Sequence, residues 1–327
     1  RTEGYDAIFV AVGAQLAKRL NLAGEDSEGV MDALLFLRSV REEDPVPLGK
    51  RVGVIGAGDT AMDCIRSAYR LGSEVTLIYR RTIDQMPADR EEIRGAIEEG
   101  IEILELAKPH ALHIEDGRLA GLVCSRMEYR GDRDSSGRKI PHEVPDSEFE
   151  VPLDTLILAI SQHSLLDFFE GRTPELNERG YLVVRPDTLE TSIPNIFAGG
   201  DVAADGPSSI VKAAADGKQV AETIIRRAAQ PVIDPVEVGD APELAELLVR
   251  RAHRQWRVPL THTPLDERMS FEETVLTYTP EEAQAEAGRC LDCHEICSLC
   301  VGVCPNMALM TYLSEPFIRQ LPVLRAR

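Results

Sequence analysis

The residues best suited to chemistry lie in a glycine-rich turn, Gly56-Ala-Gly-Asp-Thr-Ala61. A run of β-branched residues at 51–55 predicts a buried strand before the turn, and apolar residues recur at helical spacing after it. Strand, glycine turn and helix in this order are typical of a Rossmann nucleotide site. Gly56 would permit the tight turn, Gly58 would let the backbone approach a pyrophosphate, and Ala61 would allow close packing of helix on strand. The alternative is a glycine turn in an ordinary α/β layer. We expect the nucleotide to be bound by Gly56, Gly58, Asp59, Thr60 and Ala61.

The end of the second strand, Glu74–Tyr79, predicts which nucleotide is bound. An NAD site usually carries Asp or Glu there, which accepts a hydrogen bond from the ribose 2′-hydroxyl. Here the strand ends in Tyr79-Arg80-Arg81. Two guanidinium groups suit a 2′-phosphate, which a carboxylate would repel. The pattern favours NADPH, and the alternative is a pair of solvated arginines on a loop.

A cluster of cysteines near the end of the chain indicates a metal centre. Cys297-x2-Cys300-x3-Cys304-Pro matches the end of the bacterial ferredoxin run, whose first cysteine would fall at His294. Cys293 stands one residue earlier, so the loop is one residue longer. The expected ligands of a 4Fe–4S cluster are drawn from Cys290, Cys293, Cys297, Cys300 and Cys304, which leaves one cysteine to spare. A structural zinc site is the alternative.

A second strand-turn-helix signature lies at 192–203, SIPNIFAGGDVA, with a helix predicted from about Ser209 to Arg227. The two glycines would let backbone amides approach a phosphate. Asp201, at the strand end, could accept from a polyol hydroxyl. The alternative is an N-cap aspartate on a tight connection between strand and helix.

The remaining elements are predicted from periodicity and from turn residues. We expect a buried strand at Tyr5–Ala14, a helix at Gly29–Val40 with Leu34, Leu35 and Leu37 on its apolar side, and a linker marked by Pro45 and Pro47. A helix at Asp89–Glu99, strands at 101–106, 112–115, 119–129 and 154–160, and an exposed loop at 131–143 would follow. Further helices are expected at 243–256 and from Pro280.

Length, charge and cysteine usage limit the class of protein. The 327 residues are enough for two domains or more, and no apolar run reaches the length of a membrane span. The formal charge of −19, from 55 acidic and 36 basic residues, argues against nucleic acid and anionic membranes as partners. Five of the seven cysteines lie between 290 and 304, which indicates a metal cluster in a reducing cytoplasm. The other two, Cys64 and Cys124, are isolated and are expected to be core thiols.

GAGDTAMD, YRR and the MPA string at 86–88 resemble the NADPH domain of the glutamate synthase small subunit family. YDAIFVAVGA and NIFAGGD resemble the flavin-domain strands of the same family, and this similarity spans roughly residues 5–228. The tail, RCLDC followed by CxxCxxxCP, is similar to that of larger relatives such as selenate reductase subunits.

The resemblance implies an α/β fold with two Rossmann-like, three-layer dinucleotide-binding domains, one for FAD and one for NADPH, plus a small C-terminal iron–sulfur segment. It places Gly200 and Asp201 at the phosphate and ribityl chain of FAD, Ser209 and Ile210 near the flavin ring, and Gly13 among the flavin-binding residues. In many relatives the strand at 154–160 is followed by Gly-Gln, where this chain has Ser161-Gln162. The family's first glycine fingerprint should precede residue 5, so the flavin domain is expected to be incomplete here, and the parent enzyme to bind FAD where this chain alone does not.

These expectations define a domain plan: the end of a flavin domain and a linker (1–47), an NADPH domain (48–160), the C-terminal part of the flavin domain (161–230), a linker with helix (231–280) and the iron–sulfur segment (281–327). The predicted function is a cytoplasmic NADPH-dependent oxidoreductase module. It would pass electrons through FAD and a 4Fe–4S cluster to a large catalytic subunit or another acceptor protein. No catalytic side chain is expected, because the cofactors carry the chemistry. The alternatives are a non-catalytic assembly module and the reverse reaction, which makes NADPH.

Overall fold

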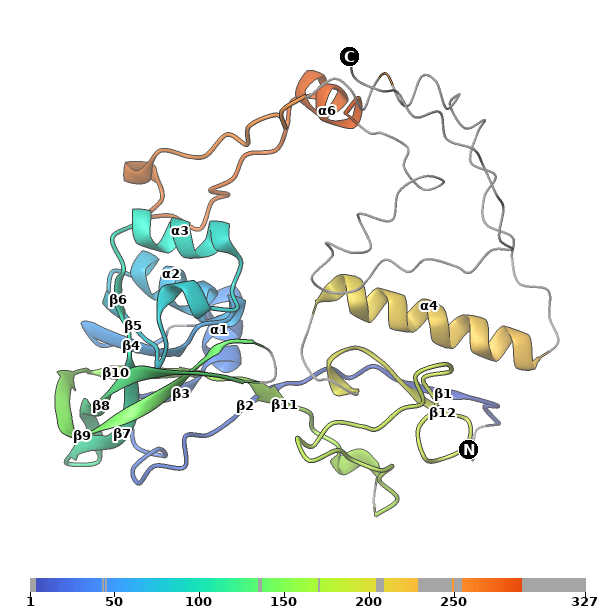
Figure 1. Ribbon diagram of the computed structural model, residues 1–327, viewed down its shortest axis with the longest axis horizontal. Helices are drawn as coiled ribbons and strands as arrows, with labels where there is room; N and C mark the ends of the chain where they lie inside the picture. The colour runs from blue at the N-terminus through green and yellow to red at the C-terminus, as the bar shows by residue number, and fades with distance from the viewer. Residues whose placement is uncertain are drawn as a thin grey trace.

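The computed structural model describes residues 4–42, 44, 46–134, 137–169, 171–203, 209–228, 249 and 255–289. The described residues form two parts, joined by the short strands β2 and β11 (Figure 1).

The first part is built on a parallel sheet of five strands. Their order is β3 (Val30–Asp32), β10 (Thr155–Ala159), β4 (Arg51–Gly56), β5 (Glu74–Ile78) and β6 (Glu102–Leu104). Side chains alternate between the two faces of such a strand, and both faces are apolar here. In β4, for example, Val52 and Val54 belong to one core and Ile55 belongs to the other.

Different layers cover the two faces of this sheet. Three helices pack on the face that carries Val52 and Val54: α1 (Ala33–Arg41), α2 (Asp59–Arg70) and α3 (Arg90–Glu98). An antiparallel sheet covers the other face, with strands β7 (Ala107–Glu115), β8 (Arg118–Arg133) and β9 (Lys139–Pro152) (Figure 1). This first part therefore has three layers, as expected for a dinucleotide-binding domain.

Two sequence-based expectations were wrong in this part. The segment 29–40 is a short strand followed by a helix, because Asp32 caps α1 by accepting from the amides of Leu34 and Leu35. Leu35, which was predicted to lie on the apolar side of the helix, is 57% exposed, and Phe36 is buried instead. Since β3 pairs with β10, residues 30–41 join the sheet of the 48–160 region, outside the boundary predicted at residue 48.

The predicted exposed loop at 131–143 is mostly strand. The β8–β9 hairpin extends through it, with β8 ending at Arg133 and β9 beginning at Lys139. Its polar composition misled the prediction because long strands of an antiparallel sheet tolerate polar residues on the face toward solvent.

The second part carries the other predicted signature. β1 (Ile8–Val10) pairs in parallel with β12 (Ile196–Ala198), a 3₁₀ turn follows at Gly200–Val202, and α4 (Ile210–Arg227) lies over the pair. Phe197 of β12 packs against Val220 and Ile224 of α4. A 3₁₀ turn at Asp167–Phe169 also belongs here. β2 (Leu16–Ala17) and β11 (Gln162–His163) pair antiparallel between the two parts (Figure 1).

Residues 255–279 run along the helical face of the first part and lead to α6 (Pro280–Ala287) (Figure 1). The segment contains one 3₁₀ turn, Leu265–Glu267, and folds back on itself where Thr263 donates to the carbonyl of Thr274. Thr279 and Glu282 form a capping box that starts α6 at the predicted place. The helix predicted at 243–256 falls almost wholly outside the described residues.

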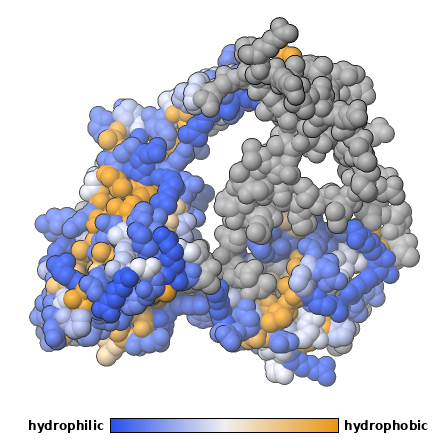
Figure 2. All heavy atoms as spheres, in the orientation of Figure 1, coloured by the Kyte–Doolittle hydropathy of each residue, from blue (hydrophilic) through white to orange (hydrophobic). Residues whose placement is uncertain are grey.

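The face shown in Figure 2 is largely hydrophilic over the described parts, with smaller groups of hydrophobic residues, in keeping with the high charge of the chain. Within the described ranges no helix is both long enough and apolar enough to cross a membrane.

Candidate nucleotide and flavin sites

Gly56 is required by the close approach of a neighbouring strand. Its φ is +148°, and a Cβ built there would lie 2.3 Å from the carbonyl oxygen of Ala159 in β10. Any larger residue would therefore push β4 and β10 apart at the carboxyl end of the sheet. Ala61, fully buried in the first turn of α2, keeps that helix close to the strands.

Gly58 presents the N-terminus of α2 to open space. It is the N-cap residue, no side chain caps the helix there, and a Cβ at Gly58 would meet nothing within 4 Å. The first amides of a helix have no partner inside the helix and favour an anion. This end of α2, at the carboxyl ends of parallel strands, therefore fits a dinucleotide pyrophosphate.

Asp59 and Thr60 are held by segments far away in sequence. The Oδ1 of Asp59 accepts from the amide of Asp89 at 2.9 Å, beside a bond from the Ala88 amide to the Ala57 carbonyl at 3.1 Å. These two bonds fasten the MPA string at 86–88 to the glycine turn. Thr60 accepts at Oγ1 from the side-chain amide of Gln162, at 3.2 Å.

The two arginines after β5 have different surroundings. Arg80 is exposed and makes no hydrogen bond or ion pair with the residues that the structure describes. Arg81 is buried, and it donates to the carbonyl oxygen of Lys139 and to the Oδ2 of Asp134, each at 3.0 Å. Of the two predicted phosphate ligands, only Arg80 has an unengaged side chain.

The predicted flavin residues share one cavity of about 330 Å³ in the second part. Its lining includes all five of them: Gly13, Gly200, Asp201, Ser209 and Ile210. Gly13 and Gly200 both have φ of +70°, which favours glycine. Ile210 opens α4 with 86% of its surface exposed, so it offers apolar area at the cavity edge. The lining therefore combines apolar surface, glycine backbone and one carboxylate, which fits a flavin.

The glycine amides of this turn are already engaged, which the sequence did not predict. The Gly199 amide donates to the Val10 carbonyl at 3.2 Å, and the Gly200 amide donates to the Oδ2 of Asp216 at 2.8 Å. Asp216 is buried in α4 and also accepts from the Nζ of Lys212 at 3.0 Å. It fixes the turn against α4, and sequence reasoning missed it because a carboxylate in mid-helix carries no motif.

The cysteines expected to bind a cluster, Cys290 to Cys304, lie outside the described residues. Within the described ranges, no group of His, Cys, Asp and Glu side chains could hold a metal ion. Cys64 and Cys124 are buried in the two cores on opposite faces of the parallel sheet, as expected for core thiols. Burial raises the pKa of the Cys124 thiol to about 12, and it raises the pKa of Cys64 as well.

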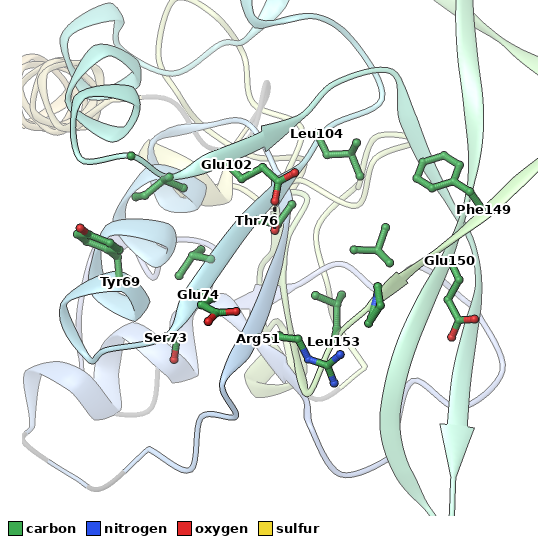
Figure 3. A pocket seen from close by; sticks show the side chains of 15 residues that line it. Arg51, Tyr69, Ser73, Glu74, Thr76, Glu102, Leu104, Phe149, Glu150 and Leu153 are labelled. Atoms are coloured by element: carbon green, nitrogen blue, oxygen red, sulfur yellow. Dashed lines mark hydrogen bonds between the residues drawn. The ribbon is translucent and has the colours of Figure 1, made fainter.

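A larger cavity of about 640 Å³ lies at the opposite end of the sheet (Figure 3). Arg51, Glu74 and Glu102, at the amino ends of their strands, line it together with Phe149 and Glu150 of β9. Nucleotides bind at the carboxyl ends of parallel strands, so this cavity is not the predicted site.

The chain has two strand-turn-helix units, and in each one a glycine turn follows the strand. Together they define an oxidoreductase fold with two dinucleotide-binding domains. Residues 1–217 match the family described as pyridine nucleotide-disulphide oxidoreductase. The chain belongs to this family of NAD(P)-dependent flavin oxidoreductases.

Named relatives confirm the resemblance drawn from the sequence. The chain is 38% identical over 309 residues to the NADP(+)-dependent formate dehydrogenase subunit beta of Moorella thermoacetica, a match that covers 89% of this chain and 43% of the relative. It is 36% identical over 239 residues to the glutamate synthase [NADPH] small chain of Escherichia coli, covering 68% of this chain and 50% of the relative. The chain thus spans half or less of the length of these relatives.

Solved structures agree on the fold. The chain superposes on Mycobacterium tuberculosis FprA in complex with NADPH with a TM-score of 0.54 at 19% identity, covering 72% of this chain and 67% of the other. This similarity shows a shared fold.

Proposed function

We propose that this chain is the electron-input module of a flavin and iron–sulfur oxidoreductase. NADPH would bind at the glycine turn of α2, with FAD in the cavity beside α4. A 4Fe–4S cluster would be held by four of the cysteines from Cys290 to Cys304, and the electrons would leave to a large catalytic subunit or another acceptor protein. A bound flavin would supply the chemistry by accepting a hydride from the nicotinamide and releasing its electrons singly.

The observation that carries the proposal is the 330 Å³ cavity, because it gathers residues 13, 200, 201, 209 and 210 from three separate segments of the chain. The open N-terminus of α2 in the other part adds a second site of the same kind. The open N-terminus of α2 would hold the nucleotide pyrophosphate, and the cavity lining would offer the flavin apolar surface and the carboxylate of Asp201. This chain would therefore bind and orient its cofactors without a catalytic acid or base.

The names of two relatives support the proposal that this chain works with a partner subunit. One is named as the beta subunit of an NADP(+)-dependent formate dehydrogenase and another as a small chain of an NADPH-dependent glutamate synthase, and both names describe one subunit of a larger enzyme. An exposed arginine at the end of β5, with no acidic residue in its place, supports NADPH over NADH.

The nucleotide site is tested by Gly58→Glu. The new side chain would enter open space at an ordinary φ of −90°, so the protein should fold, while its carboxylate would repel a pyrophosphate. We expect NADP⁺ binding in calorimetry to weaken at least tenfold, about 1.4 kcal/mol. Gly58→Ala, which adds no charge, is the matched control. Equal affinities in the glutamate and alanine variants would contradict this site.

The electron path is tested in the full-length polypeptide prepared without oxygen. Replacing Cys297 and Cys300 by alanine should spare the bleaching of flavin absorbance by NADPH and abolish turnover with the acceptor. Iron and sulfide analysis should report a 4Fe–4S centre in the parent protein. One zinc per chain without sulfide, or full turnover in the cysteine variant, would indicate that the cysteine-rich segment has a structural role and does not carry electrons. Absence of any NADPH-driven reduction would favour the assembly module.

A further inference from the structure

The β8–β9 hairpin crosses over to the carboxyl end of β5, where the nucleotide's ribose is expected. Arg81, after β5, is bound from both sides of the hairpin end, since it donates to the carboxylate of Asp134, just after β8, and to the carbonyl of Lys139, the first residue of β9, each at 3.0 Å. The Lys139 amide also donates to the Oε1 of Gln85 at 2.9 Å, in the turn that follows β5. The hairpin end therefore has a fixed position relative to Arg80 and Arg81.

This attachment brings a third arginine to the same place. Two hydrogen bonds fix the backbone of Arg138 to Asp134: the Asp134 amide donates to the Arg138 carbonyl at 2.8 Å, and the Arg138 amide donates to the Oδ1 of Asp134 at 3.0 Å. The Nε of Arg138 lies 3.5 Å from the Oδ2 of Asp134, the oxygen that Arg81 also contacts. One carboxylate thus faces two guanidinium groups.

The positive charge at this corner exceeds the negative charge. Arg80 is exposed beside the pair, and the side chain of Arg138 is 42% exposed, whereas Arg81 keeps only 8% of its side chain exposed. Desolvation lowers the pKa of the Arg80 guanidinium although the residue as a whole faces solvent, and the charges of Arg81 and Arg138 lower it further. The neighbouring pair of Lys139 and Asp84 adds one charge of each sign. Three guanidinium groups near the carboxylate of Asp134 therefore leave room for a dianion.

We propose that Arg138, carried by the β8–β9 hairpin, binds the 2′-phosphate of NADPH together with Arg80, and that Arg81 is a positioning residue that holds the hairpin in place. The inference rests on the proposed function, in which NADPH binds at the turn after β4. Arg81 is unsuited to the phosphate itself, because turning toward it would break both of its bonds and leave Asp134 without that partner. Arg138 would keep its backbone anchor while its guanidinium reached the ligand.

The test is a comparison of NADP⁺ and NAD⁺ affinities by calorimetry. Arg138→Gln should weaken NADP⁺ binding about tenfold and leave NAD⁺ binding unchanged, because only the former carries the extra phosphate. Arg80→Gln should act in the same way. The matched control is Arg130→Gln, which removes one charge from the same hairpin at an exposed ion pair with Glu128 and should change neither affinity.

A double-mutant comparison separates a positioning role of Arg81 from a general contribution to stability. If Arg81 acts by placing Arg138, then Arg138→Gln should cost much less NADP⁺ affinity in the background of Arg81→Gln than in the parent protein. Equal costs in the two backgrounds would overturn the positioning role. Thermal unfolding of each variant would confirm that the affinities refer to folded protein.

Two negative results have different meanings. A parent protein that binds NADP⁺ no more tightly than NAD⁺ would overturn the nucleotide choice and this inference together. A parent protein that prefers NADP⁺, with a preference that survives Arg138→Gln, would overturn the role of Arg138 and leave the proposed function standing.

Discussion

The side-chain amide of Gln162 donates to the hydroxyl of Thr60, with 3.2 Å between Nε2 and Oγ1. The backbone carbonyl of the same Gln162 accepts from the hydroxyl of Tyr181 at 2.8 Å. Thr60 lies in the first turn of α2, whereas Tyr181 belongs to the part that carries the flavin cavity. Gln162 therefore joins the nucleotide turn to the second part through two bonds, one from its side chain and one from its backbone.

Gln162→Ala removes only the bond to Thr60. We expect the free energy of unfolding to fall by about 1 kcal/mol, since one half-buried hydrogen bond is lost. Urea unfolding measures the change, and Gln15→Ala is the control, because the side chain of Gln15 makes just one exposed bond within the described ranges, to the carbonyl of Val12. A loss no greater than that of the control would show that the link between Gln162 and Thr60 adds no stability.

Ser161, the residue before Gln162, has a φ of +125°, in a region that favours glycine. Ser161→Gly should therefore raise the free energy of unfolding by about 1 kcal/mol through relief of backbone strain. Ser67→Gly, in the middle of α2, should have the opposite sign, because glycine weakens a helix. Thermal unfolding of both variants checks the pair of signs, and destabilisation by both would refute the strain.

The carboxylate of Asp154 binds Arg51 from its backbone and its side chain. Oδ2 accepts from the Arg51 amide at 2.9 Å, and Oδ1 accepts from Nη2 at 2.6 Å. The side-chain bonds from Arg51 hold the pKa of Asp154 below its ordinary value, with its charge and the backbone bond acting in the same direction. A lowered pKa in the folded state means that the stabilisation is complete above the unfolded pKa, about 4, and is lost as the pH falls through the folded pKa.

Asp154→Asn should accordingly cost about 1 kcal/mol at pH 7, a modest value because the pair is partly exposed. The difference from the parent protein should shrink as the pH falls below about 4. Urea unfolding across this range measures it, with Glu222→Gln as a control, since that carboxylate forms an exposed pair with Arg226 on α4. A difference independent of pH would contradict the assigned ionisation.

The sequence predicted the glycine turn after β4 well, because close backbone approach restricts Gly56 and the α2 N-terminus whatever surrounds them. It did not predict that the amides of Gly199 and Gly200 are already hydrogen-bonded. The YRR string was predictive only in part. Both arginines lie in the bend after β5, where Arg80 is exposed and Arg81 is buried. The partners of Arg81, Asp134 and Lys139, are more than 50 residues away, and nothing local in the sequence announces them.

Tertiary partners also account for the other residues that the sequence did not identify. Asp216 reads as an ordinary helical carboxylate until α4 is folded over the turn at Gly200. The hairpin at 131–143 looked like a loop because its polar residues suit either a loop or an exposed strand. Local features such as glycines and short apolar runs therefore predicted the elements that they belong to. Long-range contacts such as those of Arg81 and Asp216 could not be predicted, because they join residues far apart in the sequence.

Glu99 is the centre of the network that attaches residues 255–279 to the first part. Its side chain is 1% exposed and its Oε1 accepts from the Nη2 atoms of Arg66 and Arg70, at 2.8 and 3.0 Å. The same two arginines reach the attached segment, where Arg70 donates to the Ser270 carbonyl at 3.0 Å and Arg66 contacts the Thr274 hydroxyl at 3.4 Å. Glu99 thus orients two arginines of α2 that bind this segment.

Glu99→Gln would leave two partly buried guanidinium groups short of a countercharge. We expect a loss of about 3 kcal/mol in the free energy of unfolding, as is usual when one partner of a buried ion pair is removed. Residues 255–279 should also become cleavable by protease before the first part unfolds, because their anchoring arginines lose orientation. Urea unfolding and peptide mapping after brief proteolysis measure the two effects separately. Glu42→Gln, at an exposed pair with Arg38 on α1, should change neither. Stability loss without early cleavage at 255–279 would mean that Glu99 supports only α2 and α3, and that other contacts hold the segment.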